Sequence, residues 1–537
     1  MRDVVVVGAG HNALVAACYL AAAGLDVEVV ERDTVVGGAV STVERFPGYR
    51  VDRGSSAHIM IRHTPIVAEL ALEEVGLRYL DLEPWAFAPV AGAPGGGIRF
   101  CASVAETCAS IEAVCGSRDA DAYERFVATW LPRNLKIFSA FQSPPTPAVL
   151  GRALLAMGRG TGLGGAELAH QFLGTGDALL DATFDDERLK TALAWLGAQS
   201  GPPTSDVATA ELVAWNTVLH HTPPGRAVGG SGALSEALAR RLAASGGTLR
   251  LGDGAARITS RGGHVTGVET DGGEHVAARA VLAGCHVLTT LELAAEGLPP
   301  GLLDRARRTV RVGNGLGMVV RLGTTALPAY PDAPPDALHG LQLLATSRQQ
   351  LRAAHADFAA GRPPAEPAAL AMTFSALDPS IAPPGRHNLT VWGQWHPYDL
   401  SGGERWDDIR EREGDKLVAA LEAAAPGFAA GIEHVHVQTP LDLERELGLR
   451  RGNVMHVEMG FDSMFAFRPL PELAGYRTGL AGLYLCGAST HPGGGVFGAS
   501  GRSAARVLLA DRAGPRWRHP LRPARRVAVA ASAALRA

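Results

Sequence analysis

The 537-residue chain has only six cysteines, and no two of them form a Cys-x-x-Cys or Cys-x₄-Cys pair. A disulfide reductase needs such a close redox pair, so this class of enzyme is excluded. Cys101, Cys108 and Cys115 recur every seven residues. On a helix they would lie about 10 Å from one another, too far for a disulfide or a shared metal ion. We therefore predict buried structural thiols and no metal site.

Signals for membranes and nucleic acids are also missing. No run of about 18 apolar residues occurs, which argues against a bilayer-spanning helix. No basic segment precedes a cleavable apolar run, so we expect a cytoplasmic protein without a leader peptide. The 50 basic and 54 acidic residues give a formal charge of −4, which provides no overall attraction for nucleic acid. With 47% hydrophobic residues, the chain can bury a sizeable core in two or more units.

A nucleotide-binding unit stands at the beginning of the chain. Four valines at 4–7 predict a buried strand, followed by a glycine turn and an Ala-rich helix. Gly8 allows the tight turn, Gly10 lets the backbone approach a pyrophosphate, and Ala13 is small enough for helix–strand packing. Glu31 comes about 20 residues after the turn, where a carboxylate can accept hydrogen bonds from a ribose. This spacing predicts a βαβ unit that binds a dinucleotide.

Two further glycine segments favour FAD as that dinucleotide. Gly37-Gly38 follows the ribose-binding strand, where an extended cofactor needs close approach of the backbone. Residues 482–498 repeat the plan of apolar strand, glycine turn and helix near the other end of the chain. Two sites of one design predict one long cofactor that is held at both ends. A second complete GxGxxG unit is missing, so no dedicated NAD(P)H domain is expected.

Four segments together resemble the phytoene desaturase-like FAD oxidoreductases, the carotenoid and retinoid oxidoreductase family. These segments are residues 5–14, Glu31-Arg32 with Gly37-Gly38, residues 225–238 and residues 485–498. The GAGHN opening and the HPGGGV ending are most similar to the branch of pyridine nucleotide-disulfide oxidoreductase domain-containing protein 2. The similarity covers nearly the whole chain, and its motifs are specific for the cofactor rather than for the substrate.

The resemblance implies a set of cofactor contacts. Gly8, Gly10 and Ala13 would line the pyrophosphate, Glu31 the adenosine ribose, and Arg32, Gly37 and Gly38 the adenine side and the phosphates. Gly54 and Ser55 would lie near the flavin, and Ala255 stands where the family usually has a valine whose backbone meets adenine. Gly487, Gly495 and Val496 would present amides to the ribityl chain and to flavin N1 and O2, where charge appears on reduction.

The positions of the motifs predict an α/β fold. A discontinuous Rossmann-like FAD-binding domain of the glutathione reductase type would hold an inserted α+β substrate domain. The FAD-binding domain would comprise residues 1–75, 225–285 and 481–511, and the substrate domain residues 76–224, which are predicted to be mainly helical, and 286–480. Within the second FAD-binding segment, the pattern predicts a helix over 233–244 and strands at 248–251, 256–259, 265–270 and 278–283.

The natural acid–base candidates are histidines, because an imidazole titrates near neutrality. They are His58, His220, His221, His456 and His491. We expect His491 to fix the cofactor-binding turn by hydrogen bonds, and His220 and His221 to cap a helix or meet solvent. Since a flavin carries the difficult step itself, a side-chain base is not required. The sequence assigns no catalytic residue.

The function predicted from these features is that of an FAD-dependent oxidoreductase. It would move hydride from a C–H bond of a small apolar or isoprenoid-like substrate to flavin N5, with oxygen or a quinone as acceptor. One alternative is an amine-oxidase-like flavoenzyme, which oxidises a C–N bond. Another is a non-catalytic flavin-fold protein that binds lipids or proteins, although the complete set of cofactor glycines argues against it. The substrate and the oligomeric state do not follow from the sequence.

The last residues form a basic tail. Residues 512–537 hold seven arginines and no acid, with prolines at 515, 520 and 523. This composition favours disorder. The alternative is a peripheral membrane contact, in which each basic residue near an anionic bilayer contributes about 1 kcal/mol.

Overall fold

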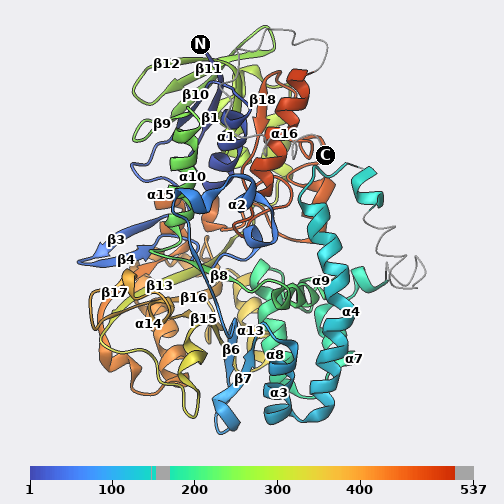
Figure 1. The fold of residues 1–537 in the computed structure, drawn as a ribbon, viewed down its shortest axis with the longest axis vertical. Helices are drawn as coiled ribbons and strands as arrows, with labels where there is room; N and C mark the ends of the chain where they lie inside the picture. Colours follow the sequence, from blue (N-terminus) through green and yellow to red (C-terminus); the bar gives the residue numbers. More distant parts are fainter. Residues whose placement is uncertain (147, 153–169, 514–537) are drawn as a thin grey trace.

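Two seven-stranded sheets lie at opposite ends of the molecule (Figure 1). The computed structural model describes residues 1–146, 148–152 and 170–513. The first sheet contains the N-terminal βαβ unit, and the second is built from segments that lie between the glycine motifs in the sequence. The predicted fold class is confirmed. The basic tail beyond residue 513 lies outside the described residues.

The first sheet has a parallel part in the order β18-β12-β1-β2-β9. Its strands are β1 (Arg2–Val7), β2 (Val27–Val30), β9 (Thr248–Arg250), β12 (His275–Ala283) and β18 (Leu483–Leu485). The valines of β1 are buried on both faces: Val4 and Val6 belong to the hydrophobic cluster of the helices, and Val5 and Val7 to that of the meander. Burial on both faces explains why the strand is apolar without alternation.

Helices cover one face of this sheet and a β-meander covers the other. The helices are α1 (His11–Ala22), α10 (Gly232–Ala244) and α16 (Ala499–Ala513), and the meander joins β10 (Ala255–Arg261) and β11 (His264–Thr270) to β12. Helices α1 and α16 lie side by side (Figure 1), so close that a Cβ on Gly501 would be 1.9 Å from the Asn12 carbonyl oxygen. The predicted helix at 233–244 and the four strands that follow it are confirmed, and each predicted end lies within three residues of the observed end.

The second sheet has the order β17-β13-β16-β15-β14-β6-β7 and is antiparallel except between β14 and β6. Its strands are β6 (Ala86–Pro89), β7 (Gly97–Phe100), β13 (Gly315–Thr324), β14 (Leu341–Leu344), β15 (Ala369–Met372), β16 (His387–Pro397) and β17 (Ile432–Gln438). Strands β6 and β7 come from the segment predicted to be mainly helical. They were missed because each is only four residues long, and the strand that joins the pair to the rest of the sheet is β14, far away in the sequence.

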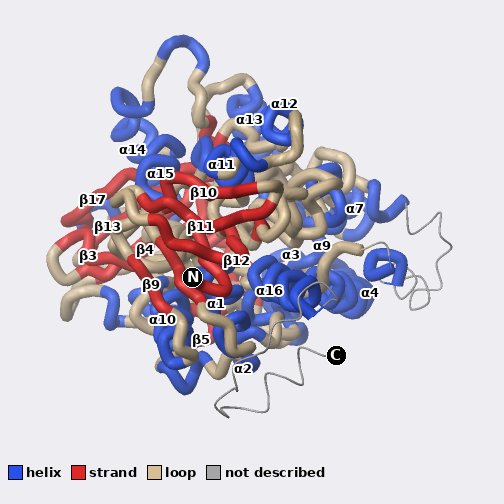
Figure 2. Tube along the Cα trace, turned by 90° about the horizontal axis from the view of Figure 1, so that it is seen from above, coloured by secondary structure: helices blue, strands red, loops and turns tan. Residues whose placement is uncertain are grey.

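Helices cover both faces of the second sheet. Seen from above, strands of both sheets lie between helices, and β13 and β17 reach one side of the molecule (Figure 2). Helix α14 (Trp406–Ala424) packs on one face, and the larger aromatic core lies between the other face and a group of helices. That group comprises α3 (Val104–Cys115), α4 (Ser117–Phe141), α7 (Gly176–Thr183), α8 (Glu187–Gly197), α9 (Ala210–Ala214) and α13 (Arg348–Ala359). No helix among the described residues is long and apolar enough to cross a membrane.

Short elements connect the two sheets. They are the pair β3 (Thr42–Phe46) and β4 (Tyr49–Asp52), the pair β5 (Tyr79–Asp81) and β8 (Gly225–Ala227), and the helices α2 (Ile66–Glu69), α11 (Val287–Leu293), α12 (Leu302–Thr309) and α15 (Pro440–Leu447). The pairing of β5 with β8 brings the chain back from the helical segment to the first sheet.

Candidate functional site: two glycine turns at one sheet edge

The N-terminal turn presents an uncapped helix end to open space. Gly8 has a positive φ of 90° and donates its amide to the Val30 carbonyl at 2.8 Å. No side chain caps α1, and its first turn holds no acidic residue. A Cβ placed on Gly10 would meet nothing within 4 Å. The positive end of the helix dipole therefore faces a space that suits an anionic group such as a pyrophosphate.

Two polar side-chain atoms at this helix end also lack partners. His11 Nε2 and Asn12 Oδ1 are buried, and neither has a hydrogen-bond partner among the described residues. Burial lowers the pKa of His11 to about 4, so the ring is neutral at physiological pH. Because buried polar groups are nearly always paired, these two atoms fit a polar ligand in the same space.

Glu31 holds the turn in place. Its Oε2 accepts the Ala9 amide at 2.6 Å, and its Oε1 accepts the Asp33 amide at 2.9 Å. The carboxylate thus links the end of β2 to the glycine turn after β1. Carboxylate oxygens have further lone pairs, so the predicted contact with a ribose is compatible with these bonds and stays a prediction.

Gly37 and Gly38 lie directly against the first turn. The Gly37 amide donates to the Ala9 carbonyl at 2.9 Å, and Gly37 forms a parallel bridge with Gly10. Both glycines have positive φ, and a Cβ on Gly37 would be 2.1 Å from the Val40 carbonyl oxygen. Only glycine fits this path of the backbone.

The C-terminal segment reaches the same edge of the sheet. A Cβ on Gly487 would lie 2.4 Å from the Gly284 carbonyl oxygen at the end of β12. A Cβ on Gly284 would in turn lie 2.6 Å from Cβ of Ala13. Gly284, which directly follows β12, thus leaves the space that the side chain of Ala13 needs after the first glycine turn. Nothing local in the sequence signals this compensation.

The second glycine turn contains a strained residue. Gly495 has φ of 97°, and the next residue, Val496, is also left-handed with φ of 58°. A β-branched residue rarely adopts this conformation, which costs on the order of 1–3 kcal/mol. The Val496 carbonyl accepts the Ile61 amide at 3.0 Å, which helps to fix the strained backbone. Such strain is typical of a functional site.

Gly54 and Ser55 lie where the first sheet meets the second. The Ser55 amide donates to the Ala39 carbonyl at 2.8 Å, next to the glycine doublet. The Gly54 carbonyl accepts Arg321 Nη2 from β13 at 3.1 Å. Arg32 and Ala255 lie close together beside the first sheet: a Cβ on Gly254, the neighbour of Ala255, would lie 2.7 Å from Cβ of Arg32.

His58 belongs to a buried polar network and is not available as an acid or base. Its Nδ1 bonds the Tyr79 hydroxyl and its Nε2 the Ser231 hydroxyl, both at 2.7 Å. Burial, and then the charge of Arg226, lowers the pKa of His58 to about 3. Arg226 forms a fully buried ion pair with Asp52, and the same carboxylate accepts the Ser231 amide. This network, which joins β4 to β8 and α10, was not predicted.

Two of the other candidate histidines, His220 and His491, differ from their predicted roles. His220 is no solvent contact, because its ring bonds the Tyr123 hydroxyl at 2.9 Å and the Ala102 carbonyl at 3.1 Å. His491 fixes its turn through its backbone carbonyl, which accepts the hydroxyls of Tyr476 and Ser500. Its imidazole instead lies among aromatic rings. His221 is exposed, as expected.

His456 lies next to the C-terminal motif, where its Nδ1 bonds the Ser489 hydroxyl at 3.2 Å. Its side chain is half-buried, and burial holds its pKa well below the usual value. The predicted histidines are therefore neutral structural groups wherever they are buried.

Aromatic rings form a wall beside the second turn. Phe141 of α4 lies 5.7 Å from the His491 ring, 5.4 Å from Phe465 and 5.9 Å from Phe497. Phe138, one helical turn earlier, lies 6.0 Å from Phe497. The wall joins the helical segment, the loop at 465 and the C-terminal motif, three parts of the chain that sequence reasoning did not connect.

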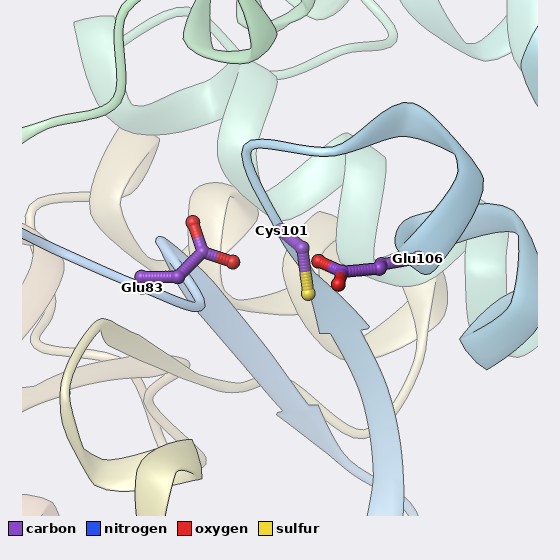
Figure 3. A group of neighbouring side chains, drawn as sticks. All are labelled: Glu83, Cys101 and Glu106. Carbon is purple, nitrogen blue, oxygen red and sulfur yellow. The ribbon is translucent and has the colours of Figure 1, made fainter.

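Figure 3 shows a group of side chains with metal-ligand chemistry, Glu83, Cys101 and Glu106, whose ligand atoms lie within 4.8 Å of one another. The Glu83 carboxylate already accepts the Ala102 amide at 2.9 Å. Burial, and then the neighbouring Glu83, raises the pKa of Cys101 to about 12, so the thiol stays protonated. The group is unsuited to a cation without loss of that proton.

The fold and the site define a Rossmann-like dinucleotide-dependent oxidoreductase. A family model described as an NAD(P)-binding Rossmann-like domain matches residues 6–71. Putrescine oxidase has the same fold, with a TM-score of 0.61 at 15% identity over 95% of this chain and 98% of that one. Curated relatives narrow the class. Pyridine nucleotide-disulfide oxidoreductase domain-containing protein 2 of Rattus norvegicus is 32% identical over 95% of this chain and 93% of its own length.

Phytoene dehydrogenase of Streptomyces griseus is 31% identical over 92% of each chain. The chain therefore belongs to the phytoene desaturase-like oxidoreductase family, as the motifs predicted.

Proposed function

We propose that the protein binds FAD and removes hydride from a C–H bond of a small apolar or isoprenoid-like substrate, with oxygen or a quinone as acceptor. The observation that carries this proposal is the convergence of two glycine turns, far apart in sequence, at one edge of the first sheet. A mononucleotide needs only one such turn, whereas FAD is long enough to require both. When bound, FAD would itself accept the hydride.

The chain's own groups would bind and orient the cofactor. The uncapped end of α1 and the open space at Gly10 suit the pyrophosphate. Glu31 would accept hydrogen bonds from the ribose hydroxyls while it keeps its bond from the Ala9 amide. Amides of Gly495 and Val496 would face the end of the flavin where negative charge develops.

The aromatic wall supports an apolar substrate. Phe138, Phe141, Phe465 and Phe497 leave few hydrogen-bonding groups beside the second turn. Such a surface excludes water and suits an apolar substrate. Phytoene dehydrogenase, a relative over 92% of both chains, is named for a hydrocarbon substrate.

Spectroscopy of the purified protein tests the proposal. We expect the visible absorption of bound flavin, which should bleach without oxygen on addition of an isoprenoid hydrocarbon and return on addition of oxygen or a quinone. NADH or NADPH alone should bleach it slowly or not at all. Bleaching by amines instead would identify an amine oxidase. Flavin that no reductant of these classes bleaches would favour a binding protein, and colourless protein that takes up no FAD would refute the cofactor assignment.

A further inference from the structure

Arg468 is a buried cation beside the second glycine turn. Its side chain has no exposed surface, and no carboxylate among the described residues pairs with it. The guanidinium donates to five backbone carbonyls, those of Met455, Val457, Glu458, Ser463 and Ala488, at distances of 2.7 to 3.3 Å. It thus bridges the loop at 455–463 to the C-terminal cofactor motif.

A buried charge without a counter-charge is costly, because the desolvation of the ion is not offset by a partner. Burial lowers the pKa of Arg468 to about 9, which still leaves the group charged at neutral pH. Neutral donors could satisfy the same carbonyls at a lower cost. The hydrogen bonds therefore explain the position of the side chain but not its charge.

The charge lies close to the turn that faces the flavin. A Cβ on Gly493 would be 3.4 Å from Cζ of Arg468, and Ala488, whose carbonyl accepts its Nη2 at 2.9 Å, belongs to the same motif. By contrast, the fully buried Arg226 pairs with Asp52. Arg468 thus lies beside the second turn, where a negative charge on a bound ligand would supply the counter-charge that it lacks.

The titratable groups that surround Arg468 do not cancel its field. Burial, and then the charge of Arg468, lowers the pKa of His491 to about 3. Burial, and then the charges of Arg450 and Arg468, lowers the pKa of His286 to about 4. His456 is affected in the same sense. The carboxylate of Glu458 turns outward and pairs with Arg311. The three histidines are therefore neutral at physiological pH, and Arg468 carries the local charge.

We propose that Arg468 is an electrostatic positioning residue that raises the reduction potential of the bound flavin. The inference rests on the proposed function. With FAD bound, hydride transfer would break the substrate C–H bond and carry two electrons and one proton to flavin N5, so that a negative charge would develop on the N1–O2 edge. The second C–H bond would lose its proton to solvent, and its electron pair would form the new double bond. Arg468 transfers no proton, and its positive charge stabilises the charge on that edge.

The midpoint potential of bound FAD tests this role by dye equilibration in Arg468→Met and Arg468→Lys. We expect the Met variant to shift the ratio of reduced to oxidised flavin at least tenfold toward the oxidised form, equivalent to a potential lower by about 30 mV. The Lys variant keeps the charge but not the fork of hydrogen bonds, and should stay near the wild type. Arg348→Met is the matched control: this largely buried arginine pairs with Asp181 and Glu187 in the second sheet region, and its loss should not move the potential.

An unchanged potential in Arg468→Met overturns the inference. An equal fall in the Met and Lys variants also overturns it, because hydrogen bonding rather than charge would then set the potential. If the Met variant loses FAD, the pH dependence of the wild-type potential tests the inference. Below neutral pH the potential should change by about 30 mV per pH unit, because reduction to an anionic flavin takes up one proton for two electrons. A change of about 60 mV per pH unit would contradict an anionic reduced flavin. A wild type that binds no FAD would instead refute the proposed function itself.

Discussion

The two glycine turns serve one edge of the sheet but are built differently. In the first turn, glycines take the unusual backbone conformations, and local elements, β1, α1 and Glu31, hold them. In the second turn, part of the strain falls on Val496, and its carbonyl is held by the amide of Ile61, which lies far away in the sequence. A turn that local elements hold can be predicted from the adjacent sequence, whereas a turn that tertiary contacts hold cannot. The experiments below separate these two designs.

The largest effect is expected for Gly10→Val. Gly10 has φ of −64° and open space around its Cβ direction, so the variant should fold normally but lose FAD because the side chain occupies the pyrophosphate space. FAD content and melting temperature measure the two effects separately. Gly501→Ala is the contrasting control: its Cβ would be 1.9 Å from the Asn12 carbonyl oxygen, so it should lose about 3 kcal/mol of stability. A Gly10→Val protein with stoichiometric FAD would remove the first turn from the cofactor site.

Glu31→Ala should weaken FAD binding by about 1.5 to 3 kcal/mol, because it removes the support of the Ala9 amide and would remove the proposed charge-assisted bonds to the ribose. Titration calorimetry with the apoprotein measures the loss. Glu31→Gln keeps the shape and one acceptor, so its loss should be smaller. Equal affinities for all three proteins would mean that another group binds the ribose.

Acid should weaken the second turn through His491. The unfolded chain binds a proton near pH 6.5, but the folded protein does so only near pH 3, because burial lowers the pKa of this ring. Between these values the unfolded state binds more protons, so stability falls as the pH falls, by about 1.4 kcal/mol per pH unit at most for one group. Denaturant unfolding at several pH values should show a flatter slope for His491→Leu. If the slopes coincide, other groups cause the acid sensitivity.

The smallest effect concerns the strain at Val496. Val496→Ala and Val496→Gly both remove the buried side chain, but only glycine relieves the left-handed conformation. The Gly variant should therefore be more stable than the Ala variant by about 1 kcal/mol, the reverse of the usual order. Thermal unfolding of the two variants gives the difference. A more stable Ala variant would show that the turn is relaxed in solution.

The sequence analysis predicted the elements of the first sheet, but it missed the distant residues that hold the candidate site in place. The valine strand, the glycine turn and Glu31 follow one another within a short stretch, so their periodicity and spacing were sufficient. Gly284, Gly501 and Arg468 were missed because their roles depend on partners hundreds of residues away or on the loop that they hold. Likewise, His220 was predicted to cap a helix or meet solvent, but its ring bonds the Tyr123 hydroxyl. Roles that arise only from tertiary packing leave no local pattern.

The mixed origin of the second sheet has a consequence for biosynthesis. Strands β6 and β7 emerge from the ribosome about 240 residues before β14, the neighbour that joins them to the rest of the sheet. Likewise, β1 can pair with β12, and β12 with β18, only after these later segments have been synthesised. Such late pairing leaves apolar strand edges unprotected during translation. Premature termination before residue 483 would thus yield an aggregation-prone fragment rather than a smaller working protein.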